Sequence, residues 1–358
     1  MKIPEACPHT IKKFELIEAY VEAWAQKLLQ YKQCSGIVFI DCMSNSGIYK
    51  DAVTAQVVYG TPIRVSALLV ETMKQYPHKK ALLYFNDKSS KKIKLLKENL
   101  PANTSNLEIF TSVMDGNELL RRFQIEPGIH YLLVYDPFEA SIEWAALTPF
   151  LNGWSEVILN HMVSDVVRGL PQATSDATKA KYVETYQMDI DGLLAIGCDY
   201  NSFEHKIHEI ITRKITTGRR HFIASFPFIN RKNGHVYNLI HCTGNIKGFK
   251  LFKTTAWKTF GGRSSIKNTH GLEKQLMFPL DGETELIIIT DEDCYNVSDI
   301  ASYLCGVFKG RKDVPFDDVY GALMEHPIFP SEGFRDDIKK ELKQYHGVTS
   351  SRSTMTFP

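Results

Sequence analysis

Short apolar segments alternate with amphipathic segments along the first half of the chain. The amphipathic segments repeat apolar residues every three or four positions, which predicts helices; in the clearest, residues 61–76, Thr61 suits the N-cap and Pro62 the first turn. The apolar segments have the length of strands and lie at residues 36–41, 80–87, 107–115, 129–138 and 155–162. Strands that are apolar throughout and joined by helices are buried on both faces. The pattern therefore predicts an α/β fold with a doubly wound, mostly parallel, Rossmann-like sheet.

The same predicted domain extends over residues 1–275. A long amphipathic helix precedes the first strand. Residues 237–245 predict a late strand, either parallel or antiparallel, with its exit at 248–253. The polar stretch 163–220 contains a helix around 203–213. We interpret this stretch either as an insertion that covers or extends a site, or as a pair of spacer helices.

The character of the chain changes after residue 272. Residues 276–297 predict a linker, and residues 298–358 predict three short helices followed by a polar, β-prone tail after Gly347. The second and third helices each carry an apolar stripe, formed by Val319, Leu323 and Met324 and by Phe334, Ile338 and Leu342. Three helices and a terminal hairpin predict a small winged-helix domain.

An acid stands at or just after the end of four consecutive predicted strands: Asp41, Asp87, Asp115 and Asp136. A single acid at a strand end is usually a helix N-cap or a solvated turn residue. The carboxyl ends of parallel strands, however, meet along one crevice, where ligands of doubly wound sheets bind. Four acids in register indicate a ligand site.

The loop after the first strand narrows the choice of ligand. The glycine-rich signatures of dinucleotide and nucleoside triphosphate sites are absent from it, so phosphate is not the expected group. S-adenosylmethionine instead offers an ammonium, a carboxylate, a ribose diol and an adenine. We expect Asp87 to accept the ribose hydroxyls and Asp115 the adenine amino group. The amino-acid end of the cofactor is expected to meet Asp41, Ser44, Ser46 and Gly47.

Six motifs in order resemble the three-Cys-motif partner (TcmP) family of bacterial, class I methyltransferase-like proteins. They are HTIKK, FIDCMSNSG, YGTPIRVSALL, VYDPFEASIEWAAL, EVILNHMVSDVVR and YNLIHCTGNIKGFKLFK, and they cover nearly the whole chain. The resemblance implies S-adenosylmethionine as cofactor and a radical-enzyme-like protein with a three-Cys motif as a possible partner. It also implies that His9 and Lys13 fold back over the crevice, where Lys13 neutralises an acid or the cofactor carboxylate; otherwise Lys13 is a surface lysine behind an N-cap at Thr10.

One departure from the family pattern concerns the loop. Met43, Ser44 and Asn45 stand where the family has Phe, Ala and Gly. Asn accepts a positive φ better than other non-glycine residues, so the turn is expected to survive. Alternatively, the Asn45 side chain occupies space meant for the methionine moiety.

The segment Asp136-Pro137-Phe138 supplies the expected catalytic residues. It resembles, with one residue fewer, the motif of methyltransferases that act on exocyclic amino groups. There the acid and a proline carbonyl hold the amino group, and the aromatic ring stacks on the base. The alternative is that Asp136 caps the next helix and Phe138 packs beneath it.

Composition adds the remaining constraints. The net charge is +1, the seven cysteines form no C-x-x-C pair, and no segment is apolar for the roughly 20 residues of a membrane span. These features predict a cytoplasmic protein without a metal ribbon. Basic residues gather at 211–221, 230–235 and 257–270, and His161 or Arg168 after the fifth strand is a further candidate for phosphate.

These observations predict an S-adenosylmethionine-dependent methyltransferase that acts on nucleic acid, either RNA or DNA. The alternative is a catalytically weak or inactive partner protein that keeps the fold and binds nucleic acid or another protein.

Overall fold

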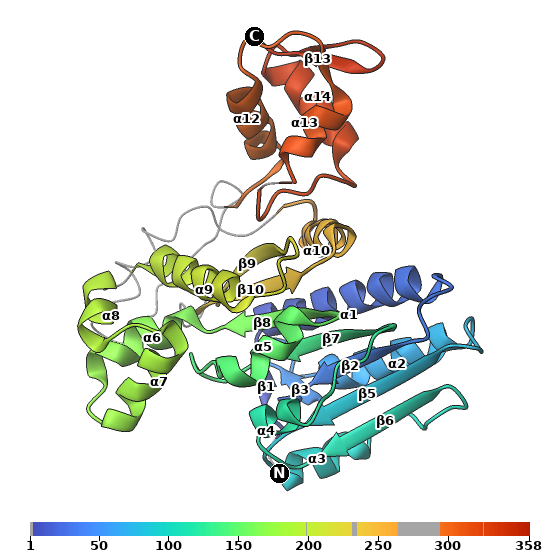
Figure 1. Ribbon diagram of the computed structural model, residues 1–358, viewed down its shortest axis with the longest axis vertical. Coiled ribbons are helices and arrows are strands. Elements are labelled where there is room, and N and C mark those ends of the chain that lie inside the picture. Colours follow the sequence, from blue (N-terminus) through green and yellow to red (C-terminus); the bar gives the residue numbers. More distant parts are fainter. Residues whose placement is uncertain (1–2, 198, 231–234, 264–293, 325) are drawn as a thin grey trace.

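A seven-stranded sheet forms the centre of the protein in the computed structural model, which describes residues 3–197, 199–230, 235–263, 294–324 and 326–358 (Figure 1). The strand order is β6-β5-β2-β7-β8-β10-β9. Five of these strands run parallel and confirm the five predicted ones: β2 (Gly36–Asp41), β5 (Lys80–Asn86), β6 (Leu107–Ser112), β7 (Ile129–Tyr135) and β8 (Ser155–His161). The α/β class and the large, mostly parallel sheet are as predicted.

The far edge of the sheet differs in part from the prediction. The late strand exists as β10 (His235–Thr243), and it runs antiparallel to β8. It forms a hairpin with β9 (Phe222–Asn230), which was not predicted. The expected strand exit at 248–253 is wrong, because these residues lie inside helix α10 (Ile246–Thr259), which Asn245 caps through Lys247 N.

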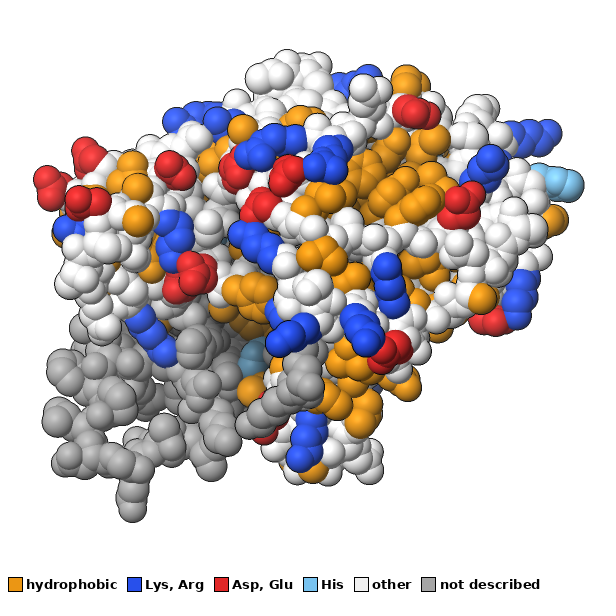
Figure 2. Space-filling view, turned by 90° about the horizontal axis from the view of Figure 1, so that it is seen from below, with side chains coloured by type: hydrophobic (Ala, Val, Ile, Leu, Met, Phe, Trp, Pro, Cys, Tyr) orange, Lys and Arg blue, Asp and Glu red, His pale blue; other side chains and the backbone are white. Residues whose placement is uncertain are grey.

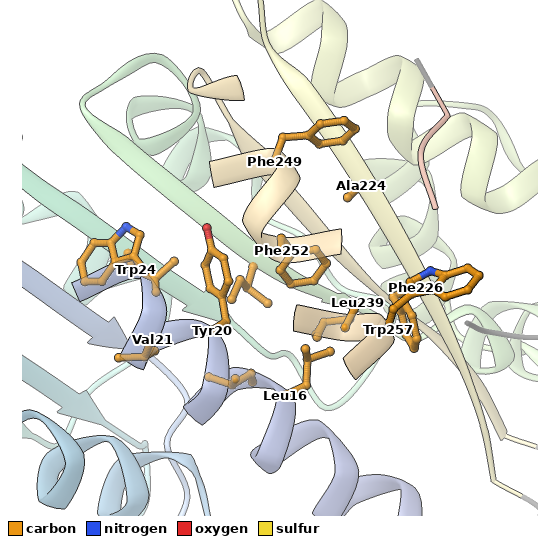
Figure 3. Packing of buried hydrophobic residues seen from close by; sticks show 14 of the residues in the cluster. Leu16, Tyr20, Val21, Trp24, Ala224, Phe226, Leu239, Phe249, Phe252 and Trp257 are labelled. Atoms are coloured by element: carbon orange, nitrogen blue, oxygen red, sulfur yellow. The ribbon is translucent and has the colours of Figure 1, made fainter. Parts of the chain in front are cut away.

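Two groups of helices cover the two faces of the sheet. One face packs against α1 (Pro8–Leu29), α2 (Thr61–Met73), α3 (Ser90–Lys97) and α10. The other packs against α4 (Gly116–Arg121), α5 (Trp144–Asn152), α6 (Val163–Gly169), α7 (Asp176–Tyr186) and α9 (Tyr200–Lys214). Figure 3 shows how α1 meets α10 and the β9–β10 hairpin through Leu16, Tyr20, Val21, Trp24, Ala224, Phe226, Leu239, Phe249, Phe252 and Trp257.

The polar stretch after β8 is helical for most of its length. It contains α6, the 3₁₀ turn η1 (Leu170–Gln172), α7, α8 (Ile190–Ile196) and α9, and the helix predicted around 203–213 is confirmed as α9. Phe203, Ile207 and Ile211 of α9 are fully buried. Because α9 covers one face of the sheet, this stretch is part of the core rather than a lid alone.

A small three-stranded sheet lies beside the main one. It pairs β1 (Glu5–Ala6) with β3 (Ile48–Asp51), and β3 with β4 (Val57–Tyr59). The pairing fixes the chain start next to the loop that follows β2. Sequence reasoning missed these strands because each is only two to four residues long.

The C-terminal unit contains three helices and three short strands. They are α12 (Val297–Phe308), β11 (Val314–Pro315), α13 (Phe316–Ala322), α14 (Arg335–Tyr345), β12 (Thr349–Ser350) and β13 (Thr354–Thr356), with strand order β11-β13-β12. Most of the predicted linker lies outside the described residues, while α12 already begins at its last residue.

The C-terminal unit packs on α10. Lys253, only 2% exposed, donates from Nζ to the carbonyl oxygens of Leu323 (2.9 Å) and His326 (2.7 Å). The indole of Trp257 donates to Ile328 O at 3.1 Å. The same helix α10 therefore packs on the sheet and on the C-terminal unit, and one apolar cluster runs through both. Within the described residues, no helix combines the length and apolarity of a membrane span.

Candidate functional site

The strand-end acids do gather at one edge of the sheet. Asp41 ends β2, which lies between β5 and β7, and its direct partners on those strands are Phe85 and Val134. Asp87 and Asp136 follow these two partners by two residues. Asp41 and Asp87 are buried, at 4% and 6% exposure. Burial raises the pKa of Asp41 to about 7, and the nearby charges of Asp136 and Asp87 add to the shift.

Three of the four acids form an ion pair with a lysine. Lys13 Nζ lies 2.5 Å from Asp136 Oδ2, and Lys88 Nζ lies 2.6 Å from Asp115 Oδ2. Lys92 Nζ lies 3.3 Å from Asp87 Oδ2. Asp41 takes part in none of the ion pairs found in the described part of the chain. It is thus the acid best prepared to receive an external cation.

The loop after β2 is held by its own polar groups. Ser44 donates from both its backbone N and its Oγ to Asn86 O, and Ser46 donates from Oγ to Ile48 O. Asn45 and Gly47 have φ values of 57° and 68°. Both predicted serines therefore shape the loop, with their hydroxyls directed to backbone oxygens.

Gly47 is required where it stands. A Cβ on Gly47 would approach Leu96 Cδ1 to 2.8 Å and Ile63 to 3.0 Å. The positive φ of Asn45 confirms that asparagine sustains the turn, and its Oδ1 accepts Ser46 N at 2.8 Å.

We expect Asn45→Gly to change the unfolding free energy by less than about 1 kcal/mol. Gly relieves the left-handed conformation but loses the Oδ1 hydrogen bond, and the two effects are of similar size. Asn45→Leu, which keeps the branched shape of the side chain, should instead cost about 1–2 kcal/mol, because Leu neither relieves the left-handed conformation nor accepts the hydrogen bond. Denaturant unfolding of the two variants checks this; equal losses would show that φ at this position is not the deciding factor.

Two asparagines complete the site, and sequence reasoning missed both. Asn86, fully buried, donates from Nδ2 to Cys42 O and Met114 O and accepts from Ser112 Oγ, so it ties the ends of β2, β5 and β6 together. Asn160, 3% exposed, donates from Nδ2 to Asp136 Oδ1 at 2.5 Å. The available signal was their position: Asn86 ends the apolar strand β5, and Asn160 is the last residue but one of the apolar strand β8.

Two side chains hold the carboxylate of Asp136, one at each oxygen. Asn160 binds Oδ1 and Lys13 binds Oδ2. Lys13 also lies 5.5 Å from the ring centroid of Tyr237, whose hydroxyl donates to His9 O at 3.3 Å. The start of α1 therefore reaches the strand-end acids: Lys13 pairs with Asp136, while His9 lies against the Tyr237 ring.

Asp136 does not cap the next helix, and Phe138 does not pack beneath that helix, so the structural alternative for this segment is wrong. The next helix, α5, begins with Glu143 at its N-cap, so Asp136 caps no helix there. Pro137 is buried, whereas Phe138 is 65% exposed and has Lys92 Nζ at 4.9 Å from its ring centroid. Phe138 thus leaves its ring accessible two residues after the carboxylate that Asn160 and Lys13 hold.

Asp115 combines two roles. Its Oδ1 accepts from Asn117 N at 2.9 Å and Glu118 N at 3.3 Å, which caps α4, while its Oδ2 pairs with Lys88. Asp115 therefore caps α4 through Oδ1, as one of the sequence alternatives had it, and only Oδ2 can exchange Lys88 for another partner.

His161 is a core residue. Its Nε2 shares a 2.7 Å hydrogen bond with Tyr186 Oη, and burial lowers its pKa to about 3. It is therefore neutral near pH 7 and supplies no cation for a phosphate.

Arg168 lies in the last turn of α6. Of the basic segments, 211–221 is described, with Arg219 over the Trp154 ring; residues 231–234 and 264–270 lie outside the described part.

No protein-family model and no curated protein matches the chain. Among solved structures, a Legionella pneumophila protein of the DUF519 family is 13% identical and has a TM-score of 0.41; 70% of this chain and 94% of that chain are covered. A loganic acid methyltransferase solved with SAH is 8% identical, with a TM-score of 0.33 and coverages of 71% and 83%. An O-methyltransferase from Bacillus cereus in complex with SAH is 12% identical, with a TM-score of 0.30 and coverages of 63% and 80%.

Proposed function

We propose that the protein binds S-adenosylmethionine and methylates an exocyclic amino nitrogen of a nucleic acid. Numbering the strands of the main sheet in chain order from β2, their order is 3-2-1-4-5-7-6, with the seventh antiparallel to its neighbours. This order is typical of class I methyltransferases, the class that the sequence resembles. The proposal that the chain is a TcmP protein rests on the same agreement between order and motifs.

The observation that carries the proposal is the state of Asp41. It is a buried carboxylate beside two other acids, and it takes part in none of the described ion pairs. An ammonium group placed against it would offset the cost of burying its charge and would reduce its repulsion from Asp136. Asp87 Oδ2 and Asp115 Oδ2, each with a displaceable lysine, suit the ribose hydroxyls and the adenine amino group.

The cofactor supplies an activated methyl group, so the protein has to align the acceptor and hold its proton-bearing nitrogen. Asp136 accepts a hydrogen bond from that nitrogen, and its orientation is fixed by Asn160. Phe138 offers its exposed face to a nucleobase. Lys13 pairs with Asp136 and must give way, at least in part, to the acceptor.

Binding of S-adenosylhomocysteine is expected to weaken as the pH falls below about 7. Below its raised pKa, Asp41 is neutral and must lose a proton before it pairs with the ligand's ammonium. Affinity at pH 6 should then be about tenfold lower than at pH 8, because roughly one-tenth of Asp41 is ionised one unit below its pKa and roughly nine-tenths one unit above it. Calorimetric titration at several pH values measures this.

The matched variant is Asp41→Asn, which should bind more weakly and without this pH dependence. A pH-independent affinity of the unaltered protein would remove Asp41 from the site. Absence of binding at millimolar ligand would overturn the cofactor proposal as a whole, and the partner-protein alternative would replace it.

The C-terminal unit is proposed to be a winged helix that takes part in nucleic-acid binding. Its element order of helix, strand, two helices and a two-stranded hairpin suits that fold. Its third helix, α14, carries Arg335 and three lysines but also Asp336, Asp337 and Glu341, so its charge is nearly balanced. The choice of nucleic acid as substrate therefore rests on Phe138 and the lysines of the site, and the C-terminal unit is a second contact.

A further inference from the structure

We infer that Lys88 and Lys92 form a phosphate-binding pair for a single-stranded nucleic acid, and that cofactor binding frees this pair. The protein then binds the nucleic acid more tightly when its cofactor site is filled. This inference rests on the proposed function and adds an order of binding to it.

The two lysines flank the start of α3. Ser89, the N-cap, accepts Lys92 N at 3.4 Å, which sets Lys88 and Lys92 on either side of the first turn. Lys88 pairs with Asp115 and Lys92 with Asp87. The side chain of Lys88 is 75% exposed and that of Lys92 is 28% exposed, so both can turn toward solvent without unfolding the helix.

The lysines and the cofactor compete for the same oxygens. Asp87 already uses Oδ1 to accept Ser89 N at 2.8 Å, so Oδ2 is the atom left for Lys92 or for a ribose hydroxyl. Asp115 likewise uses Oδ1 to cap α4 and leaves Oδ2 for Lys88 or for an amino group. Hydrogen bonds from a bound ligand therefore weaken both ion pairs, and the two lysine ammonium groups then become available to bind another anion.

The ring of Phe138 indicates which anion. It is exposed, and Lys92 Nζ lies 4.9 Å from its centroid. An aromatic face next to a cation matches one nucleotide of a single strand, in which an unpaired base stacks and the adjacent phosphate pairs with the lysine. Viewed from the side of α3 and α4, Figure 2 shows lysine and arginine side chains interspersed with hydrophobic ones on the same face. A duplex keeps its bases stacked inside and does not use the ring in this way.

Linkage makes the effect reciprocal. If the cofactor strengthens binding of the single strand by a given factor, the strand strengthens binding of the cofactor by the same factor. Removing the lysines also removes the competitors for Asp87 and Asp115. The double variant Lys88→Gln/Lys92→Gln should therefore bind S-adenosylhomocysteine more tightly than the unaltered protein.

The test is fluorescence anisotropy of a labelled single-stranded oligonucleotide of about ten nucleotides, a length within the usual site sizes. It is titrated with and without saturating S-adenosylhomocysteine at several salt concentrations. We expect about tenfold tighter binding with the ligand, within the usual range of coupling between sites. The slope of log K against log salt should steepen by about 1.4, because each freed lysine that meets a single strand contributes about 0.7.

Lys88→Gln/Lys92→Gln should abolish both changes. Lys97→Gln, in the last turn of the same helix, is the matched control and should keep them. Phe138→Ala should weaken oligonucleotide binding about tenfold in both states and leave the coupling intact.

Calorimetry on the same samples separates the two levels of the proposal. If S-adenosylhomocysteine binds but the oligonucleotide affinity does not change, the lysine coupling is refuted and the proposed function stands. If S-adenosylhomocysteine does not bind, the proposed function itself is refuted. Tighter binding of a duplex of the same length would contradict the single strand as occupant.

Discussion

Asp136→Asn is expected to lower the rate of methyl transfer by about 10²–10³-fold, the usual cost of losing one fixed group that stabilises the reacting atoms. The variant keeps the shape of the side chain and replaces one acceptor oxygen by a donor. That donor faces the acceptor nitrogen, and Lys13 loses its charged partner. Cofactor affinity should change much less than the rate, because the proposed role of Asp136 is to hold the methyl acceptor.

Transfer of a radioactive methyl group from S-adenosylmethionine to cellular RNA and to heat-denatured DNA measures the effect. Asn160→Leu, which releases Asp136 Oδ1 without touching its charge, should cost about tenfold. Glu139→Gln is the matched control, since this acid lies three residues away, 60% exposed, and pairs with Lys181. Full activity of Asp136→Asn would assign the acceptor site to other residues.

Lys253→Met is expected to destabilise the protein by about 3 kcal/mol. It removes the ammonium that satisfies Leu323 O and His326 O and leaves one buried and one partly buried carbonyl oxygen without that donor, each costing about 1–3 kcal/mol. Met fits the space of the lysine stem beside the Phe249 ring, which lies 4.1 Å from Nζ. The loss therefore arises from hydrogen bonding, with little change in packing.

Denaturant unfolding checks the size of this loss, and limited proteolysis checks its location. Lys250→Met is the control, because Lys250 pairs at 3.2 Å with Glu332, which is half exposed, and such surface pairs contribute less than about 1 kcal/mol. We expect Lys253→Met to open the contact between α10 and the C-terminal unit first. Stability equal to that of the control would mean that apolar contacts around Trp257 alone hold the two parts together.

The sheet was predictable because its central strands are apolar on both faces, a pattern that depends only on neighbouring residues. The edge strand β9 was not, since Pro227 within it argues against a strand. Proline is tolerated at an edge, and β9 is the last strand of the sheet. Gly248 lies in α10, within the segment for which the sequence predicted a strand exit. It weakens the helical pattern, yet a Cβ there would lie 2.8 Å from both carboxylate oxygens of Glu156.

The gathering of the acids was predictable because each stands at or just after the end of a predicted strand. Their lysine partners do not follow from local patterns, although Lys92 lies only five positions from Asp87, and the family resemblance alone implied that Lys13 meets an acid. Lys13 and Asp136 are 123 positions apart, and no local pattern relates them. Asn45 shows the opposite case: its tolerance of a positive φ follows from its own chemistry, so the turn was predicted correctly in spite of the departure from the family pattern.

The pairing of three acids with lysines has a consequence for the life of the protein in the cell. A cluster of bare carboxylates would repel and make the ligand-free state fragile and prone to degradation. Here each of Asp87, Asp115 and Asp136 has a lysine counter-ion, so of the four acids only the charge of Asp41 lies outside the described ion pairs. Because the three pairs offset most of the charge at this edge, the fold should persist in the cell whatever the supply of a ligand for the site.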